Sequence, residues 1–447
     1  MREVGYGELI SLGGVEFTLE PITPEQEAAQ AGYRKQTAAR VRPWVTLLLL
    51  TALQIVLTGA VLAGGAPLQS VLCMAVLSAL MWALYGFFRA IRRSGFEPET
   101  AAFLLCSFCL AVVSTSAPTQ LYKQLAAVAF GVAAYLIVGW CLRDLRRAKL
   151  VRYVASVLGV ALLLAGLTFG TEINGARNWI FIGGFSFQPS EYAKICFVSA
   201  GASSLDRLVA KRNLTLFLVY TAVICVCLAL VSDFGTALVF FTAFVVIAFL
   251  RSGNLTAIAL GCVGAGFLGL VAARFLPYIR RRAAAWGSVW ENPLTTGYQQ
   301  TRAMMCMAAG GLLGLGAGQG WLHYVAAANT DLVFALIGEE YGLIAAVTVV
   351  LTVALLAVFA VRMASHSRSA FYVIGACAAG SIFLVQTMFN VLGTVDILPL
   401  TGVTFPFLSN GGSGMIAAWG LLAFVKSVDT RQNASFTIRL PKKEAAV

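Results

Sequence analysis

Residues 332–361 read LVFALIGEEYGLIAAVTVVLTVALLAVFAV, an apolar run whose only charged residues are Glu339 and Glu340. About 20 apolar residues in a helix are enough to cross roughly 30 Å of hydrocarbon. Backbone groups in lipid must be paired within their own segment, so this run is predicted to be a membrane-spanning helix. Two adjacent glutamates about two turns into such a helix are costly in lipid, and they indicate a polar cavity or a functional site.

Similar apolar runs recur along the whole chain. Of its 447 residues, 59% are hydrophobic and 12% are charged, whereas soluble domains carry about 25% charged residues. We therefore predict an all-α polytopic membrane protein with about twelve transmembrane helices. The expected spans are 44–64, 68–89, 101–118, 121–142, 151–170, 188–205, 214–231, 233–250, 255–275, 332–361, 371–394 and 405–426.

The basic residues indicate the orientation of these helices. The net charge of +12 is concentrated in segments on one side of the predicted membrane, whereas the loops 65–67, 119–120 and 395–404 carry no Lys or Arg. This distribution follows the positive-inside rule and argues against a nucleic-acid-binding protein. We expect cytoplasmic tails at 1–43 and 428–447, with no signal peptide before residue 44.

The ten cysteines lie mostly in apolar runs, and the two histidines are far apart in sequence. Cysteines in such runs are usually small packing residues. We expect no metal site formed by His or Cys.

Two segments on the opposite side break the charge rule. Segment 171–187 contains Arg177, and the long loop 276–331 contains Arg280, Arg281 and Arg282. Loops of this length in a compact protein are usually functional. We interpret 276–331 as a large outer loop between the ninth and tenth predicted helices.

Polar residues at the predicted start of the span 188–205 form the first candidate site. Pro189 suits a first helical position, and Glu191 and Lys194 then share one helix face. They form either a structural ion pair or the polar wall of a site reached from outside. Asp233 follows Ser232 at a predicted turn, where it either caps the next helix or belongs to the same site.

Two further segments are predicted at this side. Asp331 precedes the helix that contains Glu339 and Glu340. Residues 398–414 are rich in glycine and serine and include Ser409 and Ser413. Such a stretch interrupts a helix where it lines a cavity, and its free amides can bind anions.

Four segments have now been described: those around Glu191 and Asp233, the one from Asp331 to Glu340, and residues 398–414. In this order and spacing they resemble the signature blocks of the SEDS family (shape, elongation, division and sporulation), over about residues 151–427. The resemblance implies a core of about ten helices, preceded here by an extra N-terminal pair within 44–150. It also implies a bacterial cytoplasmic membrane and polymerisation of glycan strands from lipid II. The implied partner is a class B penicillin-binding protein.

The outer loop departs from the family at its central residue. In the family a Trp-Glu-Asp-Pro-like stretch precedes Gly-Tyr-Gln, and its Asp is catalytic. Here the stretch is Trp290-Glu291-Asn292-Pro293, before Gly297-Tyr298-Gln299. An amide cannot take a proton from the acceptor hydroxyl, so Glu291 is the candidate base, with Glu339 or Glu340 as alternatives. The other departures are Asn329, Arg302, Ala303 and Asn410.

The expected substrate is a lipid pyrophosphate, which needs cationic stabilisation as it leaves. Arginine forks match phosphate oxygens, although arginines at a membrane surface also bind anionic headgroups. A Mg²⁺ or Mn²⁺ ion that arrives with the substrate is a further candidate. The predicted substrate-binding residues are Arg177, Glu191, Lys194, Asp233, Arg280, Arg281, Arg282, Gln299, Asp331, Glu339, Glu340, Ser409 and Ser413.

Three functions remain open from the sequence. The first is an active peptidoglycan glycosyltransferase. The second is a non-catalytic relative that binds lipid II or a penicillin-binding protein, as Asn292 would favour. The third is a lipid-linked precursor flippase, although no repeated halves typical of transporters are visible.

Overall fold

The computed structural model describes residues 9–12, 15–18, 24–25, 42–93, 95–173, 176–183, 185–203, 210–253, 256, 259, 262–263, 266, 286–365, 367 and 369–429. Most of the predicted span 255–275 and the three arginines at 280–282 lie outside these residues. The predicted roles of those arginines therefore stay predictions.

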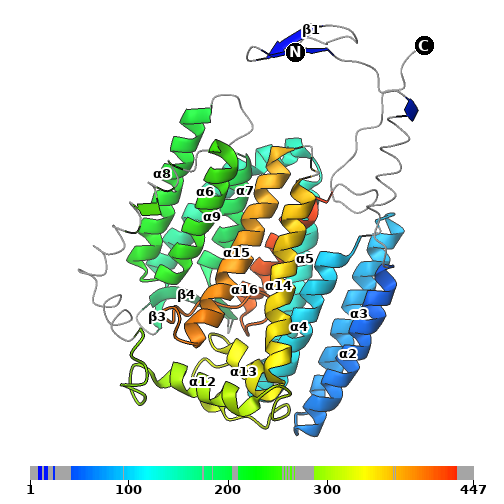
Figure 1. Cartoon of the computed structure of the whole chain (residues 1–447), viewed down its shortest axis with the longest axis vertical. Coiled ribbons are helices and arrows are strands. Elements are labelled where there is room, and N and C mark those ends of the chain that lie inside the picture. Colours follow the sequence, from blue (N-terminus) through cyan, green and yellow to red (C-terminus); the bar gives the residue numbers. More distant parts are fainter. Residues whose placement is uncertain are drawn as a thin grey trace.

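The described chain forms a bundle of long helices that run roughly parallel or antiparallel to one another (Figure 1). Eight of the described helical segments are long and apolar enough to cross a membrane, which confirms the predicted polytopic helical fold. Shorter or partly described helices complete the bundle. The main helices are α2 (Pro43–Ala63), α3 (Gln69–Ala90), α4 (Glu97–Ser116), α5 (Leu121–Leu142), α6 (Leu145–Phe169), α7 (Pro189–Ser203), α8 (Ala210–Leu230), α9 (Phe234–Ser252), α14 (Gly342–Ala364), α15 (Ala370–Thr394) and α16 (Gly412–Ser427).

Short elements gather at one end of this bundle, which we call the α12 end (Figure 1). A three-stranded antiparallel sheet, in the order β3-β4-β5, occupies the predicted outer segment 171–187. Two short helices and a 3-10 turn follow in the predicted outer loop and at the start of the next predicted span. These elements are β3 (Thr171–Ile173), β4 (Ala176–Ile182), β5 (Phe185–Phe187), α12 (Tyr298–Gly310), η2 (Leu322–Tyr324) and α13 (Val333–Glu340).

The prediction of a single helix over residues 332–361 is wrong. This part of the chain forms two helices, α13 and α14, which meet at Tyr341. In a continuous helix the N–H of Leu343 would bond to the carbonyl of Glu339. Instead Leu343 N donates to Gly311 O at 2.9 Å, and Glu339 O accepts from Leu315 N at 2.9 Å. The loop after α12 is thus inserted into the break, and Gly342 supplies the positive φ of 86° that the turn requires.

The predicted last span also begins later than expected. Residues 405–411 are not helical, and α16 starts at Gly412. Phe407 has a φ of 61°, which a right-handed α-helix does not allow. The side chain of Ser409 accepts a hydrogen bond from Phe405 N at 2.8 Å. Local side-chain bonding of this kind competes with helical pairing.

The basic helix ends lie away from the α12 end. α9 and α14 begin at the α12 end and carry Arg251 and Arg362 in their last turns, and α3 and α16 carry Arg89 and Lys426 there. This arrangement matches the predicted charge asymmetry across the membrane. The predicted N-terminal tail contains a two-stranded hairpin, β1 (Leu9–Leu12) with β2 (Val15–Thr18), which the sequence analysis did not anticipate.

Candidate functional site

The start of α7 holds a buried ion pair. Pro189 occupies the first helical position, where its missing N–H leaves no helical bond unmade. Glu191 Oε2 lies 2.7 Å from Lys194 Nζ, and the two side chains are only 6% and 2% exposed. Glu191 and Lys194 therefore lie next to each other on one face of α7, as predicted. Because each charge has been taken out of water, each depends on the other for its stability.

The start of α16 packs against this pair. Gln188 N donates to Ser413 Oγ at 3.0 Å, so Ser413 links α16 to the residue before α7. A Cβ added to Gly414 would lie 3.7 Å from Glu191 Oε2. Gly414 thus brings the first turn of α16 close to the buried carboxylate.

The non-helical segment before α16 binds the segment before α13. Ser409 Oγ donates to Thr330 O at 2.6 Å, and Asn410 N donates to Asn329 O at 2.9 Å. The Asn410 side chain donates to Gln120 Oε1 at 2.7 Å. Ser409 and Ser413 are thus hydrogen-bonded within the protein, and their contact with substrate stays a prediction.

Asp331 lies in the same group of segments. Asn390 of α15 donates to Asp331 O at 2.9 Å and to Val403 O at 3.1 Å. A Cβ on Gly402 would lie 3.4 Å from Asp331 Oδ2. One amide side chain therefore ties the segments around 331 and 403 to the same helix.

Asp233 caps α9, as one of its two interpretations predicted. Its Oδ1 accepts from Thr236 N at 3.1 Å, and its Oδ2 accepts from the Asn178 side chain at 3.1 Å. Asn178 belongs to β4, so the same carboxylate also fastens the sheet to the bundle.

Of the four arginines predicted to bind the pyrophosphate, Arg177 is the one that lies within the described residues. Its backbone N–H donates to Val231 O at 3.1 Å, which fixes the strand. Its guanidinium Nε lies 3.8 Å from Glu172 Oε2, and both side chains are 62% exposed. Such an exposed pair is weak, so the guanidinium remains available to an anion.

Glu339 and Glu340 are both about 1% exposed. Glu339 accepts from Trp321 N at 2.7 Å and from Leu322 N at 3.0 Å. Glu340 accepts from the Thr115 hydroxyl at 3.1 Å. The Glu339 carboxylate therefore fastens the loop after α12, and the Glu340 carboxylate is bonded to α4. Both have a structural role, and their contact with substrate stays a prediction.

Residues 286–297 form a series of turns that leads into α12. Gly297 packs so closely on Val289 that an added Cβ would lie 2.2 Å from the Val289 carbonyl oxygen. Glu291 and Asn292 are exposed, and Asn292 O accepts from Gly297 N at 3.1 Å. The fixed backbone thus presents two exposed side chains where the sequence placed the catalytic position.

This turn is fixed to the end of α15 by a residue that sequence reasoning missed. Asp396 Oδ1 accepts from Gly287 N at 3.2 Å and from the Gln300 side chain at 3.3 Å. Gln299, a predicted substrate residue, donates to Ala326 O at 2.9 Å. An acidic residue in a predicted outer loop without Lys or Arg was the available signal for Asp396.

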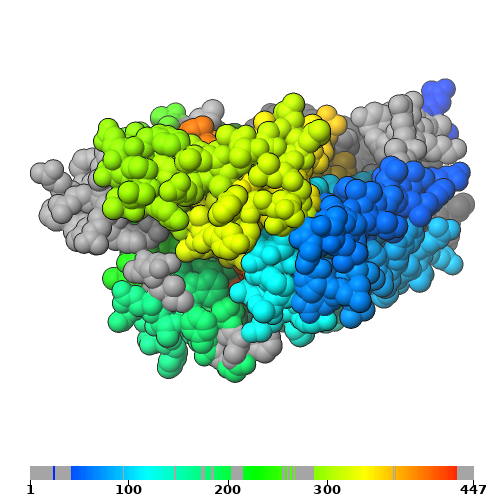
Figure 2. Space-filling view, turned by 90° about the horizontal axis from the view of Figure 1, so that it is seen from below, coloured from blue at the N-terminus to red at the C-terminus, as the bar shows by residue number. Residues whose placement is uncertain are grey.

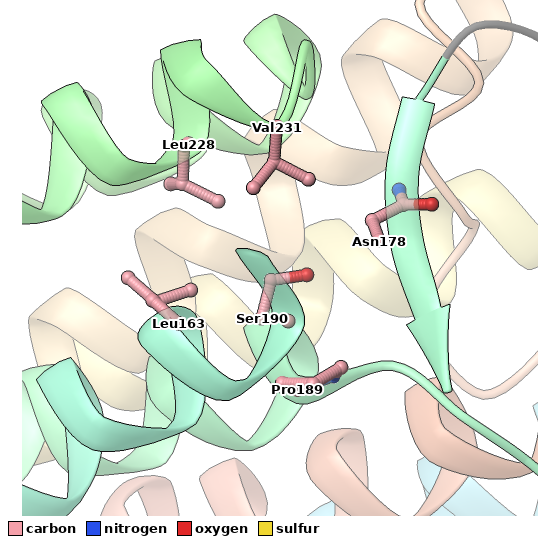
Figure 3. A pocket seen from close by; sticks show the side chains of 7 residues that line it. Leu163, Asn178, Pro189, Ser190, Leu228 and Val231 are labelled. Atoms are coloured by element: carbon pink, nitrogen blue, oxygen red, sulfur yellow. The ribbon is translucent and has the colours of Figure 1, made fainter. Parts of the chain in front are cut away.

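A small pocket lies beside β4 (Figure 3). It is lined by Leu163, Gly166, Asn178, Pro189, Ser190, Leu228 and Val231. Ser190 Oγ is buried and makes no hydrogen bond within the described part of the chain. The pocket is mostly apolar, and it opens between α6, α7 and α8.

A second buried ion pair lies far from these residues, and the sequence analysis did not find it. Lys426 Nζ lies 3.2 Å from Glu99 Oε1, with both side chains fully buried, and the Tyr135 hydroxyl donates to the same oxygen. Lys426 is the last residue of the predicted span 405–426, at the side of the membrane where basic residues are expected. Glu99, near the start of α4, was the signal, but the predicted span began after it.

Seven of the predicted site residues fall into two groups. One surrounds residues 401–414 and contains the Glu191–Lys194 pair, Asp331, Ser409 and Ser413. The other is the exposed turn with Glu291 and Asn292, fixed by Asp396. Both groups belong to elements at the α12 end (Figure 1). Across the described residues, no group of three His, Cys, Asp or Glu side chains could hold a metal ion.

Comparison with known proteins gives one consistent family. Residues 101–434 match the FtsW/RodA/SpoVE family, described as cell cycle proteins. The peptidoglycan glycosyltransferase RodA of Mycobacterium tuberculosis is 30% identical over 320 residues, which cover 67% of this chain and 68% of that protein. The stage V sporulation protein E of Bacillus subtilis is 31% identical over 291 residues, covering 62% and 77%.

Solved structures show the same fold. A chain from a peptidoglycan synthase complex, in which polymerization and crosslinking are structurally coordinated, superposes with a TM-score of 0.64 at 25% identity and covers 74% of this chain and 96% of that one. The Thermus thermophilus rod shape determining protein RodA gives a TM-score of 0.56 at 22% identity, covering 74% and 95%.

Proposed function

The chain belongs to the FtsW/RodA/SpoVE family of cell cycle proteins, and from this premise we propose that it is a peptidoglycan glycosyltransferase of the bacterial cytoplasmic membrane. Curated relatives from several bacteria carry that activity in their names. The proposed substrate is lipid II, which the enzyme polymerises at the α12 end. The basic helix ends at the opposite end support an outward-facing α12 end and cytoplasmic termini.

The proposed chemistry needs one base and one stabilised leaving group. The 4-hydroxyl of the acceptor sugar attacks the anomeric carbon of the donor and gives its proton to a carboxylate. The bond from that carbon to the phosphate oxygen breaks, and its electron pair leaves with the lipid pyrophosphate. Cationic groups lower the energy of that departing charge.

Glu291 is the proposed base. Glu339 and Glu340 are buried, and their oxygens accept hydrogen bonds from Trp321 N, Leu322 N and the Thr115 hydroxyl. Glu291 is exposed, next to Asn292, on a turn whose backbone is fixed at both sides. The observation that carries the proposal is this free carboxylate on a fixed turn at the end where the family signature residues gather.

The remaining roles follow from charge. Arg177 and the arginines at 280–282 are proposed to bind the pyrophosphate, together with a Mg²⁺ or Mn²⁺ ion brought by the substrate. The buried Glu191–Lys194 pair is proposed to form part of the polar wall of the site. The proposed partner is a class B penicillin-binding protein, in keeping with the fold shared with a chain of a peptidoglycan synthase complex.

The test uses the full-length purified protein with its partner, lipid II and a divalent cation. Glycan strands should form with the wild type and fall by at least about a hundredfold with Glu291→Gln, since general-base catalysis contributes about 10²–10⁴-fold. Asn292 favours a second function, a relative that binds lipid II without polymerising it. Saturable binding of lipid II with no product from the wild type would establish that second function.

A further inference from the structure

The helices α2 and α3 lie outside residues 101–434, the part of the chain that matches the family. They form an antiparallel pair on the flank of α4 (Figure 1). Neither helix carries any of the residues that the sequence or the family places in the site. Their contacts nevertheless lead directly to the outer loop.

The pair is fastened to α4 by polar bonds as well as by apolar packing. Gln54 of α2 is 1% exposed and donates to Ser107 Oγ of α4 at 2.9 Å. Its side-chain oxygen accepts from Ser78 of α3. Polar bonds between helices in lipid fix their register, because an unpaired amide there is costly. At the end of the pair, Gln69 donates to Pro118 O at 3.2 Å.

The turn between α2 and α3 presses on the outer loop. A Cβ added to Gly64 would lie 1.9 Å from Ala317 O, and one added to Gly318 would lie 3.1 Å from Gly64 O. Gly64 has a φ of −78°, so glycine is needed here for space and not for its backbone angle. Seen from the α12 end, the loop in yellow-green lies directly beside α2 and α3 in blue (Figure 2).

The same short piece of loop is held from its other side. Gly318 packs near Thr115 of α4, with an added Cβ 3.3 Å from its Cγ2, and Thr115 bonds to Glu340. Trp321 and Leu322 bond to Glu339. The loop is therefore clamped between the α2–α3 turn and the glutamate pair.

The clamp continues to the turn that carries Glu291. Gly310, the last residue of α12, packs so tightly on α13 that an added Cβ would lie 2.2 Å from Gly338 O. α12 in turn begins directly after residues 286–297. The loop at Ala317 is thus connected through α12 to the exposed turn.

We propose that the α2–α3 pair is a brace that positions the outer loop, with Gly64 as its positioning residue. Its catalytic consequence rests on the proposed function, but the brace itself does not. Without the contact at Gly64, the amides bonded to Glu339 open more often, and the turn at 286–297, which Asp396 still holds, loses part of its support. The brace lies outside the part of the chain that matches the family.

The test compares Gly64→Val with Gly59→Val in the full-length protein. Gly59 lies on the same helix, and a Cβ there would meet nothing within 4 Å, so it reports the general effect of valine on α2. If Gly64→Val does not fold, Gly64→Ala replaces it, because its methyl group meets the same carbonyl. Thermal unfolding in detergent confirms that each variant is folded.

Hydrogen exchange at Trp321 and Leu322 is the first readout, since protection depends on local opening. Gly64→Val should speed it by on the order of tenfold, leaving the centre of α15 unchanged, whereas Gly59→Val should match the wild type. With lipid II, Gly64→Val should lower kcat more than it changes KM. Equal exchange in the two variants would overturn the brace, whether or not the wild type polymerises lipid II.

Discussion

Glu191 Oε2 lies 2.7 Å from Lys194 Nζ, one helical turn apart in α7, with both side chains nearly inaccessible to solvent. The pair lies at the end of the bundle where the family signature residues gather, and the first turn of α16 packs against it at Gly414. A pair in this place can support the fold, the substrate, or both. Substitutions that restore apolar packing separate these roles.

Single substitutions of this pair should be severely destabilising. Glu191→Gln or Lys194→Met leaves one uncompensated buried charge, which costs about 3–5 kcal/mol. The double variant Glu191→Leu with Lys194→Met should recover most of that loss in thermal unfolding. If the pair forms part of the site, the double variant is stable but does not polymerise lipid II; a stable and fully active double variant would limit the pair to a structural role.

Glu339 should be essential for the loop through its two acceptor oxygens. Glu339→Ala leaves the amides of Trp321 and Leu322 without their partner, at a cost of about 1–3 kcal/mol for each buried donor. Glu339→Gln keeps one acceptor oxygen and should lose less. Unfolding of both variants in detergent shows which of them loses more stability. An equal loss of stability in the two variants would contradict the role of Glu339 as the acceptor for these two amides.

Asp233 should behave as a helix cap. Asp233→Ala should lower the free energy of unfolding by about 1 kcal/mol, and Asp233→Asn should lower it only slightly because asparagine also caps helices well. The Asn variant is also the functional control. A large fall in kcat/KM for Asp233→Asn, with stability preserved, would show that the negative charge serves the substrate as well.

The Glu99–Lys426 pair offers a comparison at the opposite end of the bundle. Lys426→Met should cost about 3–5 kcal/mol, because Glu99 would remain buried and unpaired. The double variant Glu99→Gln with Lys426→Met should be more stable than Lys426→Met. Per folded molecule, its polymerisation rate should equal that of the wild type, and a selective fall in kcat would contradict our placement of the site.

Much of the fold could be predicted from the sequence, because hydrophobic length alone defines a membrane helix. The predicted span 121–142 coincides with α5, and 371–394 differs from α15 by one residue at its start. The break at Tyr341 could not be predicted in the same way. It arises because residues 311–316, distant in sequence from α14, supply the hydrogen-bond partners that a continuous helix would have used.

In the candidate site, too, residues with local contacts could be predicted from the sequence, whereas residues with long-range contacts could not. Glu191, Lys194 and Asp233 could be found because their spacing is local, within one helical turn or one cap. Asp396 and Lys426 pair with residues nearly a hundred positions or more away in the chain, Gln300 and Glu99. A single sequence can mark such a residue as unusual, but it does not identify the partner. The position of the turn with Glu291 likewise depends on long-range contacts.

The central claim is that this chain polymerises lipid II with Glu291 as the base. The most direct measurement compares glycan strand formation by the wild type, Glu291→Gln and Asn292→Asp, each purified at full length with its partner. We predict an active wild type, a loss of at least about a hundredfold in Glu291→Gln, and an Asn292→Asp variant at least as active as the wild type. An inactive wild type that Asn292→Asp makes active would contradict the claim and identify a binding protein that has lost its catalytic base.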